Sequence, residues 1–203
     1  MAKQKPTSTK KPNPLTSKQD ILMSIKPTHM TNIALGKKNH EYRRYLLPAS
    51  VQRLWLYTTA PVSRIEYVAR ISRGKTRGQV PEDGGLGNAD FNAGKKVSSY
   101  AYAILDLWRL REPISLRDAV ARGFLRGAPQ KYCWTPVALV EEYSLARQDH
   151  LLSREEESCL ERGGDNNDDE GGSKASSGTA FGGVSLTGES KISDFFAPLA
   201  ADG

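Results

Sequence analysis

The chain of 203 residues has little cysteine and no long apolar run. Its two cysteines, Cys133 and Cys159, lie far apart. This spacing does not support a disulfide framework or a cysteine-rich zinc site, and both thiols are expected to be reduced inside a cell. No apolar stretch is long enough to predict a transmembrane helix. The N-terminal segment has no apolar h-region, so a secretory signal is not expected.

Motifs for metals, cofactors and covalent catalysis are also missing. Three histidines occur without metal-ligand spacing (His29, His40 and His150), and there is no Walker lysine motif or nucleophile elbow. The stretch "GLGNADFNAG" lacks the third glycine of a dinucleotide fingerprint and opens no long helix. The sequence therefore predicts no metal and no cofactor.

Acidic residues are few in most of the chain and concentrated at its end. Residues 1–19 carry five lysines and no acid, and residues 20–152 carry twenty cations and twelve anions. Residues 153–203 carry four cations and eleven anions. A basic body with an acidic tail is typical of a protein with a polyanionic partner.

Composition divides the chain into four parts. Hydrophobic residues make up 38% of the sequence and the mean hydropathy is −0.54, so part of the chain is expected to lie outside a packed core. Residues 1–19 are predicted to be a disordered basic arm, and residues 20–152 a folded domain. Residues 153–187 read as a disordered acidic Gly/Ser linker. Residues 188–199, where apolar side chains return, form a separate peptide motif.

The predicted domain mixes strands with short helices. Strands are expected at 21–25, 38–46, 51–59, 63–72 and 100–110, from short apolar runs and imperfect alternation. Helices are expected from Pro27 to a left-handed C-cap at Gly36, at 115–123 between Ser115 and Gly123, and at 136–148. Residues 72–97 read as a long loop with one helical turn at 88–92. This order predicts an α+β domain built around a small, mostly antiparallel β-barrel.

The stretch "LGKKNHEYRRYL" carries the densest charge in this domain. Four cations (Lys37, Lys38, Arg43 and Arg44) surround Glu41. On a strand neither face would be apolar, which a buried strand tolerates only if its charges pair or bind a ligand. Two interpretations follow. The stretch is an exposed edge strand in which Glu41 bridges a neighbouring cation, or it is the wall of an anion site.

The segment "ILMSIKPTHMTNIALGKKNHEYRR" resembles the opening of an ASCH domain, a branch of the PUA-like superfamily. The matching positions are Lys26, Pro27, Gly36, Lys38, Glu41 and Arg43. "LWLYTTAPVSRIEYVARI" and "GNADFNAGKKVSSYAYAILDLWRLREPISL" are similar to the continuation, so the resemblance covers about residues 20–140. It implies a PUA-like small β-barrel with a basic cleft, and binding of RNA, DNA or a modified base in that cleft.

The resemblance implies a set of ligand-binding residues, Lys26, Lys38, Glu41 and Arg43, and the adjacent Arg44 is added to this set as part of the basic rim. The cations suit phosphate or base acceptors, and a glutamate suits an exocyclic amine. Six aromatic residues could stack on an unpaired base, although most are expected in the core: Trp55, Tyr57, Tyr100, Tyr102, Tyr132 and Trp134.

Two other functions stay open. Some ASCH proteins resemble amidohydrolases that deacylate modified nucleosides such as acetylated cytidine, using a lysine, a threonine and a later glutamate. Lys38 and Glu41 are then the catalytic candidates, with Glu41 at the threonine's place and Glu66 as an unassigned later acid. A protein-binding adaptor is the third alternative.

The end of the chain, "ESKISDFF", resembles a PIP box, the peptide that docks on the PCNA-type sliding clamp. Ile192, Phe195 and Phe196 match its aliphatic and aromatic positions, and Glu189 stands where glutamine is usual. Such residues fill a groove as a hydrophobic plug on one helical turn. The motif predicts a clamp partner and a nuclear location, with the cytoplasm left open, and no membrane partner is expected.

Overall fold

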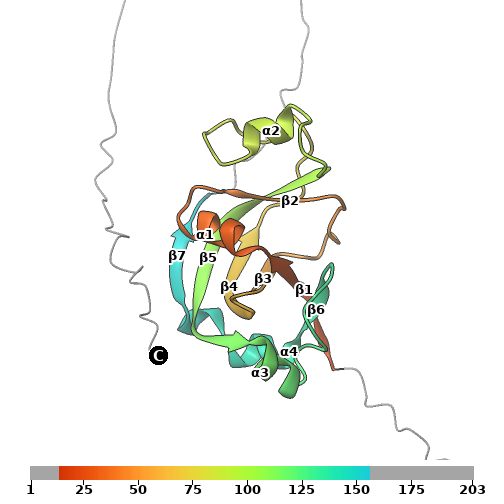
Figure 1. Cartoon of the computed structure of the whole chain (residues 1–203), viewed down its shortest axis with the longest axis vertical. Helices are drawn as coiled ribbons and strands as arrows, with labels where there is room; N and C mark the ends of the chain where they lie inside the picture. Colours follow the sequence, from red (N-terminus) through yellow and green to blue (C-terminus); the bar gives the residue numbers. More distant parts are fainter. Residues whose placement is uncertain (1–13, 156–203) are drawn as a thin grey trace, which may run out of the picture. The chain divides into compact units, whose positions relative to one another are not determined.

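The structure is a computed structural model that describes residues 14–155 (Figure 1). Its seven strands are β1 (Thr16–Ile25), β2 (His40–Arg43), β3 (Arg53–Thr58), β4 (Arg64–Ile71), β5 (Tyr100–Ser115), β6 (Cys133–Pro136) and β7 (Asp149–Ser153). Its helices are α1 (Pro27–Ala34), α2 (Asn88–Asn92), α3 (Leu116–Ala121), α4 (Val137–Glu142) and the 3₁₀ turn η1 (Leu145–Arg147). None of these helices is long and apolar enough to cross a membrane.

The strands form one mixed sheet in the order β2-β5-β4-β3-β1-β6, with β7 also paired to β5. β1 and β3 are parallel, and the other pairs are antiparallel. Edge strand β2 approaches β1, which neighbours the opposite edge strand β6, and Arg43 of β2 donates to the Ser24 carbonyl of β1 at 3.1 Å. The chain therefore has the predicted α+β fold, and side chains rather than a backbone ladder join β2 to β1.

Alternating side chains give the sheet two hydrophobic cores. Ile21, Met23 and Ile25 of β1 pack with Met30 and Ile33 of α1 on one face. The other face packs residues such as Leu22 and Trp55 against the α3 and α4 region. Period-2 alternation along β1 and β3 thus separates α1 from the two later helices (Figure 1).

The fold begins earlier than the sequence predicts. Strand β1 starts at Thr16, which the composition assigned to the basic arm ending at residue 19. Thr16 pairs with Pro136 of β6, and Ser17 donates to the fully buried Asp20 carboxylate at 2.6 Å. Pairing to a distant strand orders these polar residues, and no local pattern reports such pairing.

Two strands were missed, and several element ends besides the start of β1 were misplaced; the strand predicted at 38–46 spans only His40–Arg43. β6 and β7 are short, and β7 is largely exposed, so neither shows clear alternation. β5 runs to Ser115 rather than ending at residue 110, and the helix predicted at 136–148 stops at Glu142 before η1. The helical turn at Asn88–Asn92 and the left-handed Gly36 and Gly123 are as predicted.

Candidate functional site

Strand β2 presents Glu41 and Arg43 toward the core against which α1 also packs. Gly36, with φ of 72°, ends α1, and the Lys38 amide then donates to the Asn32 carbonyl at 2.9 Å. Pairing with β5 sets Glu41 opposite Tyr102, a member of the same core. Directly opposite residues of an antiparallel pair share a face, so the carboxylate of Glu41 is carried inward.

Glu41 joins two cations inside the protein. Its Oε2 lies 2.7 Å from Lys38 Nζ, and its Oε1 lies 3.0 Å from Arg43 Nη2. Lys38 and Glu41 are only 5% and 6% exposed. Lys38 Nζ also donates to the His40 carbonyl, and Arg43 Nη2 donates to the Ser24 carbonyl. The predicted bridging role of Glu41 is therefore present, but at a buried edge of the core rather than on an exposed strand.

Burial is the main influence on the pKa of the Lys38 ammonium, and it lowers this pKa. The charges of Arg43 and Lys96 lower it further, whereas the carboxylate of Glu41 raises it. The ammonium lies 4.8 Å from the ring centroid of Tyr42, and Lys96 Nζ lies at the same distance. An ammonium near an aromatic face gains electrostatic energy when it loses water. The Tyr42 ring therefore interacts with two ammonium groups, that of Lys38 just before β2 and that of Lys96 from the long loop.

Further cations surround this network at the surface. The pKa of His29 on α1 is lowered, first by the loss of solvent around its ring and then by the positive charges of Lys38, Lys26 and Lys96. The negative charge of Glu41 acts in the opposite direction and raises this pKa. Lys26 is exposed and Lys96 half-buried. We call Lys26, Lys38, Glu41, Arg43 and Lys96 the basic cluster. Lys96 was missed by the sequence reading because it arrives from the long loop by tertiary packing alone.

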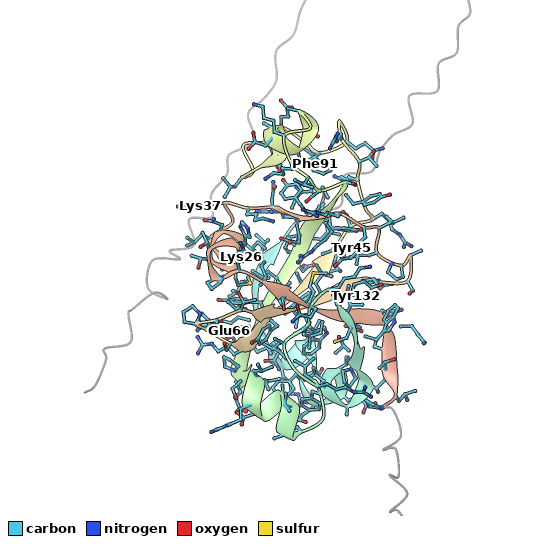
Figure 2. All side chains as sticks on the ribbon, turned by 45° about the vertical axis from the view of Figure 1, so that its right-hand side comes forward. Lys26, Lys37, Tyr45, Glu66, Phe91 and Tyr132 are labelled. Atoms are coloured by element: carbon cyan, nitrogen blue, oxygen red, sulfur yellow. The ribbon has the colours of Figure 1, made fainter. Side chains whose placement is uncertain are left out.

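The other predicted residues stand apart. Arg44 is exposed just beyond β2, and Lys37 is exposed while its carbonyl accepts from the Leu86 amide at 2.8 Å. Glu66 is buried on β4 and pairs with Arg64 at 2.8 Å. Figure 2 shows Glu66 lower in the view than Lys26. Among residues 14–155, the ion pairs of Glu66 do not include the basic cluster.

The long loop covers the other face of β2. Tyr42 packs on Phe91 of α2 with ring centroids 5.2 Å apart, and its hydroxyl donates to Asn88 at 2.6 Å. Asn88 also donates to Asp83 at 2.9 Å. These contacts fix the loop, and they thereby fix Lys96 beside Lys38.

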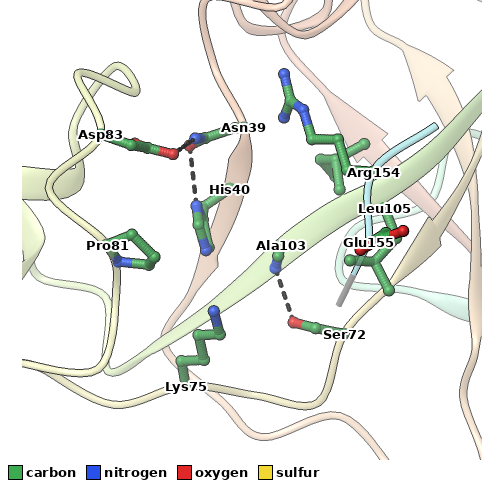
Figure 3. A pocket seen from close by; sticks show the side chains of 11 residues that line it. Asn39, His40, Ser72, Lys75, Pro81, Asp83, Ala103, Leu105, Arg154 and Glu155 are labelled. Carbon is green, nitrogen blue, oxygen red and sulfur yellow. Dashed lines mark hydrogen bonds between the residues drawn. The ribbon is translucent and has the colours of Figure 1, made fainter. Parts of the chain in front are cut away.

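A small cavity of about 90 Å³ lies beside β5, between the start of β2 and the end of β7 (Figure 3). His40 lines it together with Lys75 and Arg154. His40 Nδ1 lies 2.9 Å from Asn39 Oδ1, and His40 Nε2 is buried without a hydrogen-bond partner. Burial, and then the charge of Lys75, lowers the pKa of His40 to about 4. The imidazole is therefore neutral at neutral pH.

The predicted stacking residues divide into two groups. Trp55, Tyr57 and Tyr102 are buried in the two cores. Tyr100, Tyr132 and Trp134 are only half-buried. Tyr132 and Trp134 pack together with Tyr45, which the sequence reading did not single out.

No family model matches the sequence, and no curated protein matches it. Solved structures with a similar fold include the ASCH protein from Zymomonas mobilis, at 19% identity, a TM-score of 0.46, and coverage of 66% of this chain and 98% of that one. A serine-to-alanine mutant of ZmASCH gives 23% identity and a TM-score of 0.49, with coverage of 63% of this chain and 96% of that chain. At these identities the likeness concerns the fold alone.

Proposed function

We propose that this protein binds nucleic acid and holds an unpaired or modified nucleotide against the basic cluster. The supporting observation is a group of four cations around one carboxylate: Lys38 and Arg43 pair with Glu41, Lys96 lies with Lys38 at the Tyr42 ring, and Lys26 acts with both lysines on His29. Glu41 neutralises only part of this charge. The remaining positive charge suits phosphate, whose binding releases condensed counterions.

The members of the basic cluster have different tasks in this proposal. Lys26 and Lys96 reach solvent and contact phosphate, whereas the buried Lys38 and Glu41 hold Arg43 in place. The Arg43 side chain is 21% exposed, so in this proposal it also meets a phosphate or a base acceptor. Arg44 adds charge at the rim. Replacing Lys26 and Lys96 therefore tests binding without removing a buried charge.

Lys26→Met combined with Lys96→Met is expected to weaken binding to a single-stranded 12-nucleotide RNA or DNA by roughly tenfold or more at low salt. The slope of log K against log salt should also become shallower, by about 0.7 for each phosphate that the variant no longer neutralises. Methionine keeps the apolar stem of lysine, so the packing of Lys96 on Tyr42 is largely preserved. Fluorescence anisotropy at several salt concentrations measures both quantities.

The matched control is Arg117→Met on α3, where the arginine side chain is 90% exposed and lies outside the basic cluster. It removes one cation without touching the proposed site, so affinity should change little. Equal losses in the control and in a single Lys26→Met variant would mean that binding follows net charge alone. The proposed site would then be wrong.

A second candidate is the amidohydrolase of acylated nucleosides. The observation that favours it is the buried Lys38–Glu41 pair, with the Lys38 pKa lowered by burial, since such pairs can transfer protons. Glu66, the later acid, is engaged by Arg64. Turnover of acetylated cytidine that disappears in Lys38→Met but persists in Arg117→Met would establish this activity over simple binding.

The proposal includes tethering to a PCNA-type sliding clamp and a nuclear location. The tail motif supports this part of the proposal: Glu189 is followed by Ile192, Phe195 and Phe196. The whole motif lies outside the described residues. Because about three dozen residues of acidic Gly/Ser-rich sequence separate the motif from the domain, both could be engaged at once.

A peptide spanning residues 188–199 is expected to bind the clamp with a micromolar Kd, because three apolar side chains fill one groove. Phe195→Ala with Phe196→Ala should abolish the heat of binding in titration calorimetry. Glu189→Gln restores the usual residue and should tighten binding. A peptide that gives no heat, and does not compete with a known clamp ligand, would remove the tether from the proposal.

A further inference from the structure

Beside the basic cluster lies a second surface made of aromatic rings and lysines. Tyr45 follows β2, Tyr132 and Trp134 belong to the β6 region, and Lys18 and Lys131 stand over their rings. We call these five residues the aromatic platform. Figure 2 shows Tyr45 directly above Tyr132.

The rings of the platform form one continuous group. Tyr45 and Tyr132 have centroids 5.8 Å apart and are tilted by 36°, and Tyr132 and Trp134 meet edge to face at 6.4 Å. All three pack against the core from outside and remain half-buried. Each ring is therefore held against the core while part of its residue stays accessible to solvent. Rings held in this way lose little conformational entropy when a ligand stacks on them.

The lysines of the platform carry uncompensated charge. Lys131 Nζ lies 4.1 Å from the Tyr45 centroid and 5.5 Å from that of Tyr132, and Lys18 Nζ lies 5.9 Å from Trp134. Neither lysine takes part in an ion pair within residues 14–155. The nearby Asp20 is taken by Arg53, Trp55 and Ser17. Stacking faces beside free cations are the elements of a single-strand binding surface.

Arg43 connects the platform to the basic cluster. Its Nη2 contacts Glu41 on one side and the Ser24 carbonyl on the other, and Ser24 Oγ donates to the Pro129 carbonyl at 2.6 Å. This contact fixes the segment that leads into Lys131 and Tyr132. The charge of Arg43 also acts on the Tyr45 hydroxyl. The two surfaces are thus adjacent and are linked through Arg43 and Ser24.

We propose that the aromatic platform stacks the bases of a single-stranded nucleic acid whose neighbouring phosphates lie on the basic cluster. This inference rests on the proposed function and narrows its ligand to a single strand. Paired bases in a duplex are stacked on one another and cannot offer their faces to protein rings. The platform therefore selects single strands over duplexes, whichever sugar they contain.

The test compares one fluorescein-labelled 12-nucleotide strand, as RNA and as DNA, with the duplex of the same sequence. Wild-type protein should bind the single strands more tightly than the duplexes. Tyr132→Leu and Tyr45→Leu should each weaken single-strand binding by roughly tenfold, the loss typical of one base–aromatic stack, and leave duplex binding unchanged. Tyr132→Phe keeps the ring and should keep the affinity.

The matched control is Tyr143→Leu at the end of α4, where a half-buried tyrosine also lies beside a cation, Arg122, at 5.9 Å. It should leave all affinities unchanged. If single strands and duplexes bind equally and the Tyr45 and Tyr132 variants match this control, the platform inference is wrong. Lys26 and Lys96 variants that still weaken binding would then leave the proposed function standing. Absence of any binding at low salt would remove both.

Discussion

Glu41→Ala is expected to lower the free energy of unfolding by about 3–5 kcal/mol, the cost of removing one partner from a buried ion pair. The substitution leaves the Lys38 ammonium 5% exposed without its carboxylate, which lies 2.7 Å away in the native protein. Arg43, which is more exposed, can turn toward water, so most of the loss should come from Lys38. Urea unfolding followed by circular dichroism measures the change.

Two further variants separate this cause from a general effect of removing glutamate. Glu142→Ala breaks an ion pair with Arg122 in which the glutamate side chain is 48% exposed, and exposed pairs contribute only about 0–1 kcal/mol. Glu41→Ala combined with Lys38→Met removes both buried charges and should recover much of the lost stability. A double variant as unstable as Glu41→Ala would show that the buried ammonium is not the source. Glu41→Gln serves as the milder replacement if Glu41→Ala does not fold.

Local signals in the sequence predicted the parts of the fold that depend on local chemistry. Pro27 and Gly36 bound α1, and Ser115 caps α3 by accepting from the Asp118 amide at 3.1 Å. Because neither face of the stretch around Glu41 is apolar, its charged pattern predicted ion pairing, and Glu41 does pair with Lys38 and Arg43. Such signals act over a few residues and can be read without knowing the fold.

The parts that were missed depend on contacts between distant residues. β7 is a mostly exposed edge strand ordered by pairing with β5, and its sequence carries no alternation to reveal it. Lys96 reaches Tyr42 across more than fifty residues of chain, and Tyr45 meets Tyr132 across more than eighty. Pattern reading could identify the basic residues around β2 and the aromatic candidates Tyr132 and Trp134, but not Lys96 and Tyr45, which reach them by tertiary packing.

Lowering the pH from 6.5 to 4 is expected to reduce the free energy of unfolding by roughly 3 kcal/mol through His40 alone, since one pKa unit corresponds to about 1.4 kcal/mol. The folded-state pKa of about 4 lies below the ordinary value of 6.5. Between these values the unfolded chain takes up a proton that the folded protein does not. Stability is therefore fully present above pH 6.5 and falls progressively toward pH 4.

The physical reason lies in the cavity shared with Lys75. Asn39 Oδ1 accepts from Asn88 Nδ2 at 3.1 Å, so the 2.9 Å contact with His40 places the imidazole hydrogen on Nδ1. A second proton would enter on Nε2, which is buried without a partner. Lys75, Lys38 and Arg154 oppose that added charge, and the carboxylate of Asp83 offsets them in part.

His40→Asn isolates this contribution, because its amide can still donate to Asn39 but takes up no proton. Its unfolding free energy should change by roughly 3 kcal/mol less than that of the wild type between pH 6.5 and 4. His29→Asn, at the solvent-exposed histidine of α1 whose pKa is lowered less strongly, should remove a smaller part of the pH dependence. Parallel curves for His40→Asn and the wild type would mean that His40 is already charged in the folded protein. The cavity would then have to hold an imidazolium close to Lys75, against the electrostatics of its lining.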